Sequence, residues 1–189
     1  MCLGKRTRLK SLNPITQVDS PLHLNISYWN IHGFKSRILG NKLIDPDFLS
    51  EIKNSDIIGL GETHAYDEIV DHLNIPGFSR LKCKNRKKRK NNTASGGISV
   101  FVKENMRHLF HPVDTKNDDI IWLKIKKENM GLSEDIYLGT SYISPHEGKK
   151  EESVKMENLA EDIINFKRAG GLFYSKVTLM QELQPQMIL

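Results

Sequence analysis

The stretch Ile57-Ile58-Gly59-Leu60-Gly61-Glu62-Thr63-His64 decides how this chain of 189 residues folds. Its first four residues form an apolar run, which predicts a short buried strand. Glu62 follows one residue later, at a strand end where the backbone is fixed. A carboxylate in such a place suits a hard cation such as Mg²⁺, which keeps several waters and needs only one or two protein carboxylates. The alternative is that Glu62 is an ordinary carboxylate at the entry to a loop.

A second strand is predicted earlier in the chain, over residues 24–31, and it contains Asn30 near its end. The segment between the two strands predicts a helix over residues 46–53, because Asp45 suits the N-cap and Pro46 the first turn. Two polar side chains thus follow two strands joined by a helix. Asn30 is a candidate to orient a phosphate or a metal-bound water, and the alternative is that it merely makes a turn with Gly33.

The remaining pattern predicts further strands and a second helix. Apolar residues at helical spacing, from Met156 to Ile164, predict this helix, and Gly170-Gly171 ends it. Before it, a loop containing Gly131 fits a hairpin between two strands. The mixture favours an α/β or α+β fold with helices over a partly antiparallel sheet. The predicted strands span residues 78–83, 98–102, 120–125 and 136–143.

The chain is basic, with 28 Lys and Arg against 23 Asp and Glu, a net charge of +5 and a pI near 9.1. Much of the excess lies in the run from Lys82 to Lys90. A loop that contacts the phosphates of a nucleic acid is one interpretation of this run, a nuclear-localisation signal is another, and a solvated loop is a third. The candidate phosphate contacts are Arg86, Lys87, Lys88, Arg89 and Lys90.

Other sequence features narrow the cellular setting. Two cysteines, Cys2 and Cys83, provide no disulfide framework. No apolar segment is long enough for a bilayer, and the polar N-terminus lacks the apolar core of a signal peptide. The sequence therefore predicts an intracellular protein, nuclear or cytoplasmic, without membrane contact. The histidines lack Cys/His zinc spacing, and His64 is expected to have a structural role.

Four pieces in order resemble the endonuclease/exonuclease/phosphatase superfamily, with the endonuclease domains of non-LTR retrotransposons as the closest relatives. The resemblance covers roughly residues 24–170. It implies an α/β fold in the form of a two-sheet α/β sandwich. It also implies an activity, the hydrolysis of phosphodiesters or phosphomonoesters with Mg²⁺. The pieces are Trp29-Asn30-Ile31-His32-Gly33, Ile57 to His64, Gly96-Gly97 with the following strand, and Ser141-Tyr142-Ile143-Ser144-Pro145.

The resemblance also implies roles for individual residues. Glu62 would be the metal ligand and Asn30 a catalytic residue at the metal site or phosphate. Tyr142, which the residues alone would place in a core, would hydrogen-bond the scissile phosphate. DNA is the expected partner, with RNA as the alternative. His32 departs from the pattern, because relatives commonly carry Asn or Asp at that position.

A second departure concerns the region after the last predicted helix. The superfamily continues with a strand that ends in Gly-Asp-x-Asn, and then with a later Asp and a Ser-Asp-His region, none of which occurs in this sequence. We therefore expect a partial sandwich with an incomplete second half. The expected parts are a flexible lead-in over residues 1–22, the N-terminal portion of the domain over residues 23–170, and a divergent tail over residues 171–189.

The expected function is that of a C-terminally truncated, Mg²⁺-dependent endonuclease-like domain with impaired catalysis. One alternative is a non-catalytic remnant that binds nucleic acid or a protein partner. Another keeps the superfamily but has a phosphorylated small molecule or lipid as the substrate, and the basic run favours nucleic acid over it.

Overall fold

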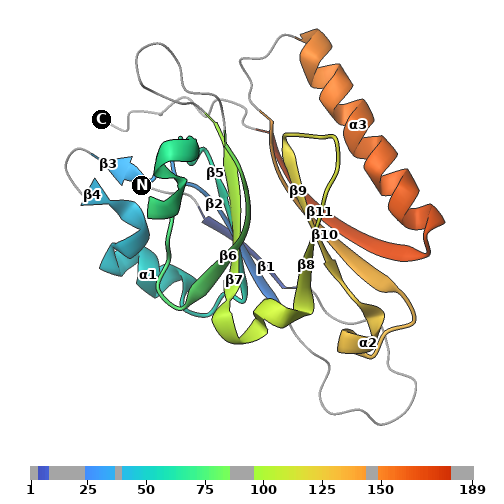
Figure 1. Cartoon of the computed structure of the whole chain (residues 1–189), viewed down its shortest axis with the longest axis horizontal. Coiled ribbons are helices and arrows are strands. Elements are labelled where there is room, and N and C mark those ends of the chain that lie inside the picture. Colours follow the sequence, from blue (N-terminus) through green and yellow to red (C-terminus); the bar gives the residue numbers. More distant parts are fainter. Residues whose placement is uncertain (1–3, 9–23, 37–39, 86–95, 144–148, 180–189) are drawn as a thin grey trace, which may run out of the picture.

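Two β-sheets face each other, and helices cover their outer faces (Figure 1). The computed structural model describes residues 4–8, 24–36, 40–85, 96–143 and 149–179. The first sheet has the order β1 (Gly4–Arg8), β2 (Asn25–Asn30), β5 (Ile57–Gly61), β7 (Ile98–Lys103), β6 (Phe78–Lys84). The second has the order β11 (Gly171–Leu179), β10 (Asp135–Ile143), β9 (Ile120–Ile125), β8 (Phe110–Val113). The predicted two-sheet α/β sandwich is confirmed.

The other elements are short, apart from one helix. The helices are α1 (Pro46–Ile52), α2 (Lys127–Met130) and α3 (Lys149–Arg168). The 3₁₀ turns are η1 (Lys42–Ile44), η2 (Asp67–His72) and η3 (Glu104–Leu109), and a small ribbon pairs β3 (Lys35–Ser36) with β4 (Gly40–Asn41). No helix among the described residues is long and apolar enough to cross a membrane.

The strand register of the first sheet brings several chain segments to one edge. β2 and β5 are parallel, and Asn30 at the end of β2 pairs with Gly61 at the end of β5. β7 is antiparallel to β5, so that Ile98 at its start pairs with Gly61. Lys84 at the end of β6 pairs with Ile98 in turn. We call this side of the molecule the strand-end edge.

The helix between β2 and β5 begins as the sequence predicts. One carboxylate oxygen of Asp45 accepts hydrogen bonds from the backbone N–H groups of Asp47 at 3.0 Å and Phe48 at 3.2 Å. These bonds satisfy donors that have no partner within the helix. Pro46 occupies the first turn, where its missing N–H costs nothing. The helix therefore starts at a defined residue and returns the chain to β5.

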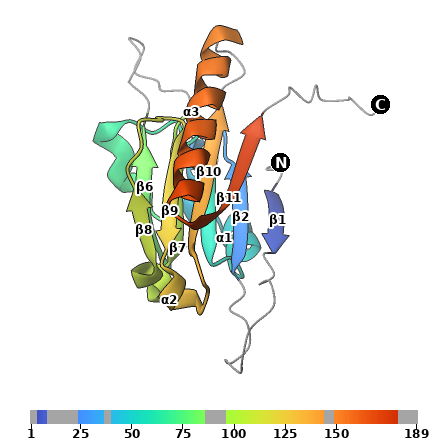
Figure 2. The ribbon, with the colours of Figure 1, turned by 90° about the vertical axis from the view of Figure 1, so that its right-hand side faces the viewer.

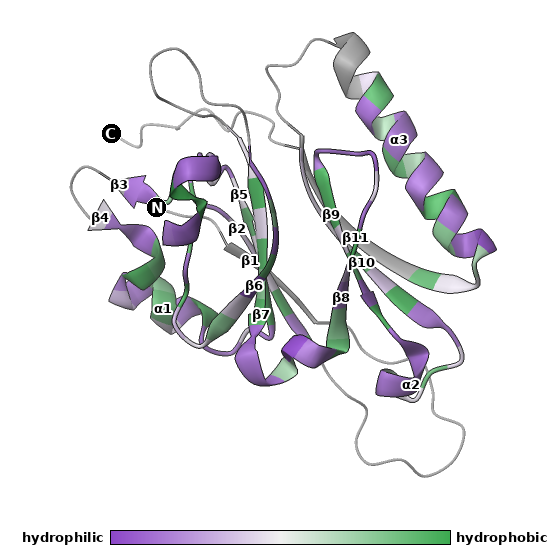
Figure 3. Ribbon diagram, viewed as in Figure 1, coloured by the Kyte–Doolittle hydropathy of each residue, from purple (hydrophilic) through white to green (hydrophobic). Residues whose placement is uncertain are grey.

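The space between the sheets is filled by apolar side chains from both of them. Figure 3 shows hydrophobic segments along the strands of both sheets, while α2 is hydrophilic and α3 alternates between hydrophilic and hydrophobic residues. Burial of this kind contributes roughly 25 cal/mol for each Å² removed from water. The buried members of this cluster are Leu24, Ile57, Ile98, Val100, Val102, Phe110, Ile121, Leu123, Ile125, Leu138 and Tyr142.

Each sheet also packs against helical elements on its outer face. Under α1 and η2, a cluster that includes Trp29, Ile58 and Leu60 covers the first sheet. α3 lies across the second sheet (Figure 2), where Leu159 and Phe166 pack against Trp122. The indole N–H of Trp122 donates to the Asp162 carboxylate at 2.9 Å. The order of layers is helix, sheet, sheet, helix.

Two segments differ from the sequence expectation. Gly4–Arg8, expected within the flexible lead-in, pairs antiparallel with β2. Its residues are mainly charged or polar, so hydropathy gives no strand signal, and backbone hydrogen bonds at a sheet edge define it. Gly171–Leu179, expected to begin the divergent tail, forms β11 and pairs in parallel with β10 over its full length. A strand, α3 and a parallel strand make a crossover unit, which local periodicity does not reveal.

Candidate metal centre at the strand ends

Glu62 lies just beyond β5 with its side chain pointing into the junction of the two sheets. Only 12% of that side chain is exposed to solvent. Its backbone is in the left-handed region, with φ at 52°. A non-glycine residue in this region costs of order 1–3 kcal/mol and persists only where the surroundings hold it.

The backbone around Glu62 is held by loops on both sides. On one side, the N–H of Gly33 donates to the carbonyl of Glu62 at 2.7 Å. On the other, the N–H groups of Thr63 and His64 donate to the carbonyls of Gly97 and Gly96, at 3.3 and 2.9 Å. These bonds offset the cost of the left-handed backbone, and they explain the glycine pair that precedes β7.

Gly97 is required by both its conformation and its surroundings. Its φ is 88°, and a Cβ atom placed there would lie 2.7 Å from the hydroxyl oxygen of Thr63. Thr63 is fully buried, so it has no free space in which to move. The Gly96-Gly97 piece of the sequence therefore shapes the loop that carries Glu62.

Tyr142 connects the second sheet to Glu62. The tyrosine lies near the end of β10, is buried, and donates its hydroxyl proton to Oε1 of Glu62. Its backbone N–H donates to the carbonyl of Asp119 at 3.1 Å, which fixes the end of the strand. Two residues 80 positions apart in the sequence thus meet in one contact.

Two histidines complete a cluster around the carboxylate. Nδ1 of His32 lies 2.9 Å from Oε2 of Glu62. Ligand atoms of His32, Glu62 and His64 all lie within 4.8 Å of one another. Neither histidine was expected at the site from the sequence. The available signal is positional, because His32 lies two residues beyond Asn30, at the end of β2, and His64 lies three residues beyond Gly61, at the end of β5.

Asn30 lies at the same edge, and its amide oxygen accepts the backbone N–H of His32 at 3.1 Å. This bond makes a local turn that helps to hold His32 at φ 46°. The turn that was the alternative for Asn30 is thus present, although its partner is His32. A catalytic role for Asn30 remains a prediction.

The electrostatics of the cluster favour an ionised Glu62. Burial alone would raise the pKa of this carboxyl group. Hydrogen bonds from Tyr142 and His32, with the nearby imidazoles of His32 and His64, act in the opposite direction and outweigh it. The net pKa of Glu62 is lowered, so the group is a carboxylate at neutral pH.

The candidate phosphate contacts, Arg86 to Lys90, lie outside the described residues. The residues on either side of that segment are at the strand-end edge, because Lys84 pairs with Ile98. The Lys84 ammonium donates to the carbonyl of Asn117, and its burial lowers its pKa. The described residues that precede and follow residues 86–95 therefore lie on the side where Glu62 lies.

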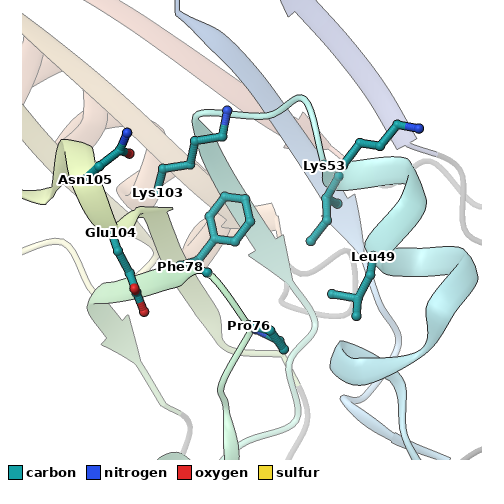
Figure 4. A pocket seen from close by; sticks show the side chains of 9 residues that line it. Leu49, Lys53, Pro76, Phe78, Lys103, Glu104 and Asn105 are labelled. Atoms are coloured by element: carbon teal, nitrogen blue, oxygen red, sulfur yellow. The ribbon is translucent and has the colours of Figure 1, made fainter.

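A pocket of about 480 Å³ lies at the opposite end of the strands (Figure 4). Leu49 and Phe78 line it, and Lys53, Lys103 and Glu104 lie at its rim. Lys103 pairs with Asp56 at 2.9 Å. Asn30, Glu62 and Tyr142, the predicted site residues that the structure describes, do not line this pocket, so it is separate from the polar cluster.

The chain is thus a two-sheet α/β sandwich with a cluster of one carboxylate and two histidines where the two sheets meet. No known family model matches the chain, and no curated protein sequence matches it. Among solved structures, it is similar to the human Nocturnin catalytic domain with a bound sulfate anion, at 16% identity and a TM-score of 0.47. The match covers 80% of this chain and 62% of that one, so the chain spans less than two thirds of the Nocturnin domain.

Proposed function

We propose that this chain carries the cation-binding part of a phosphodiester hydrolase site of the endonuclease/exonuclease/phosphatase type, and that it binds DNA while cutting it poorly. The observation that carries the proposal is the position of Glu62. Its carboxylate lies where the two sheets meet, is mostly buried, and is held by Tyr142 from the facing sheet. The sequence pieces that resemble the superfamily lie around this contact.

The donor chemistry of Glu62 fits a divalent cation. Two carboxylate oxygens offer about four lone-pair sites. Tyr142 occupies one on Oε1 and His32 one on Oε2, which leaves one on each oxygen for a ligand. Mg²⁺ is the cation that the resemblance implies. When bound, a divalent cation neutralises charge on a phosphate and helps a water to attack it.

Tyr142 would have two tasks, to orient Glu62 and to contact the phosphate. A phenol hydroxyl has a single proton, which here goes to Glu62. A tyrosine that donates to a phosphate must therefore release the carboxylate first. Asn30 would keep the His32 turn in place through its amide oxygen.

We expect weak catalysis because residues that a complete site of this type needs are missing from the sequence. The superfamily's Gly-Asp-x-Asn motif does not occur in the residues that follow α3 in this sequence. Within the described part of the chain, Glu62 is the one carboxylate of its cluster. Removing one member of a catalytic unit often costs most of the rate. We therefore expect the chain to bind DNA without hydrolysing it efficiently. A non-catalytic remnant that binds nucleic acid would give the same result.

A cleavage assay tests this function directly. Nicked, abasic and plain duplex DNA are incubated with the full chain and Mg²⁺, beside Glu62→Ala and Glu104→Ala. Glu104 is exposed at the opposite end of the strands, so it is the matched control. We expect DNA to be bound by all three proteins and cleavage to stay near the level without protein. Efficient cleavage that only Glu62→Ala abolishes would contradict impairment, and absence of DNA binding would contradict the proposed partner.

The salt dependence of DNA binding tests the basic run. Changing Arg86, Lys87, Lys88, Arg89 and Lys90 to Gln should lower the slope of log affinity against log salt. The expected loss is about 0.9 for each phosphate contact removed, because each contact releases condensed counterions. Fluorescence anisotropy of a labelled duplex, measured at several salt concentrations, gives the slope.

A control with the same number of Arg and Lys residues uses the opposite end of the strands. Lys53, Arg107, Lys126, Lys127 and Arg168 are exposed there, and their replacement by Gln removes the same charge. This variant should keep most of the slope. Equal slopes for the two variants would mean that net charge, and not the basic run, drives the interaction.

A further inference from the structure

We infer that the site at Glu62 is a two-histidine, one-carboxylate centre, with His32 and His64 as additional ligands, and that it selects a transition-metal dication such as Zn²⁺ over Mg²⁺. The inference rests on the proposed function, because it names the cation class of the same site. Its basis is the cluster itself, in which ligand atoms of all three residues lie within 4.8 Å of one another.

The spacing of the ligand atoms suits one metal ion. Zn²⁺ binds imidazole nitrogen and carboxylate oxygen at about 2.0–2.2 Å, so donors around a tetrahedral ion lie roughly 3.3–3.6 Å apart. Nδ1 of His32 and Oε2 of Glu62 are already 2.9 Å apart. The side chain of His32 is 83% exposed, which leaves it room to rotate about the ion. Small rotations therefore convert the hydrogen-bonded cluster into a ligand set.

The backbone fixes the three residues in a shared arrangement. His32, Glu62 and His64 all have left-handed φ angles, between 46° and 53°. The two loops that carry them are joined by the bond from Gly33 N–H to the Glu62 carbonyl. A second support comes from the Lys42 ammonium, which donates to the carbonyls of Ile31 and His32 at 2.8 and 3.2 Å. The side chains thus project from a braced turn.

The type of ligand decides the type of metal. Mg²⁺ prefers oxygen donors in a near-octahedral shell and retains several waters. Imidazole nitrogen suits zinc and its neighbours in the first transition series. Two imidazoles and one carboxylate leave at least one position for water or a phosphate oxygen, as catalytic zinc sites do. At an oxygen-only version of this site, the preference for Zn²⁺ would be much smaller.

The experiment replaces the nitrogen ligands and keeps the backbone. Asn accepts the left-handed region more readily than most residues, so His32→Asn/His64→Asn retains the turn while it substitutes amide oxygen for imidazole. Zn²⁺ affinity is measured by competition with a chromophoric chelator, and Mg²⁺ affinity by calorimetry. The visible spectrum of added Co²⁺ reports nitrogen ligation. The full chain is used throughout, and circular dichroism confirms folding.

We expect Zn²⁺ affinity to fall by about 100-fold or more in the double Asn variant, since even indirect metal partners cost 10–100-fold. Mg²⁺ affinity should change little. The control His72→Asn/His111→Asn changes two exposed histidines outside the cluster, and it should bind Zn²⁺ like the original chain. Equal Zn²⁺ affinity in the two double variants would overturn the inference. If Glu62-dependent Mg²⁺ binding persisted in that case, the proposed function would stand without it.

Discussion

Gly61→Ala is expected to lower the free energy of unfolding by about 3 kcal/mol, the upper part of the usual range for overpacking. A Cβ atom at this position would lie 2.0 Å from the hydroxyl oxygen of Tyr28 and 3.0 Å from its Cζ. Tyr28 is 6% exposed and cannot swing into solvent. Gly61 itself has an ordinary φ, so the expected loss is steric. Chemical denaturation with urea measures it.

Tyr28→Phe supplies the matched rescue, because it removes the oxygen atom that the new Cβ would meet. The double variant should recover much of the stability, and a double-mutant cycle isolates this coupling. Gly77→Ala is the control for backbone effects: its φ is 79° with no atom within 4 Å of the added Cβ, so it should cost only about 1–2 kcal/mol of strain. A Gly61→Ala protein as stable as the original would show that Tyr28 does not pack tightly against Gly61.

Much of the first sheet could be predicted from local sequence. The apolar run before Glu62 can be read as a buried strand because it is continuous and short. The helix before it has both a capping carboxylate and a proline in its first turn, and Asp45 makes the expected bonds. Predictions of this kind succeed where neighbouring residues determine the structure.

The parts that could not be predicted depend on distant contacts. The partnership of Glu62 with Tyr142 requires the two sheets to face each other, and the proximity of His32 to Glu62 requires the parallel register of β2 and β5. Neither is visible in periodicity. The sequence around His64 contains no Cys/His spacing, so a structural role is expected for it. Its partner in the cluster, His32, lies in a separate loop, and the sequence alone does not show that the two loops meet.

The other differences between the sequence predictions and the structure lie at the edges of the two sheets. β1 lacks an apolar pattern, and β11 follows a long crossover through α3, so each is defined by backbone pairing with an inner strand. The domain boundaries that the sequence predicts, with a divergent tail over residues 171–189, remain a prediction. The pairing of β11 with β10 adds one strand to the second sheet, next to the strand that carries Tyr142.

Glu62→Gln is expected to weaken Mn²⁺ binding by at least about 100-fold, because a charged ligand should matter more than an indirect partner, whose loss costs 10–100-fold. Mn²⁺ is a suitable probe, since carboxylate oxygen is one of the donors that suit it. Glutamine keeps the side-chain length and an oxygen that can accept the Tyr142 proton, but it removes the negative charge. The fold should therefore persist. Glu104→Gln, an exposed carboxylate far from the cluster, is the matched control.

The most direct measurement of the central claim follows the sharp electron paramagnetic resonance signal of free Mn²⁺ during titration with each protein. We expect the original chain and Glu104→Gln to remove one equivalent of this signal, while Glu62→Gln leaves it almost unchanged at the same concentrations. If Glu62→Gln removed the signal as fully as the original chain, or if the original chain removed none, the carboxylate at the end of β5 would not be a cation site.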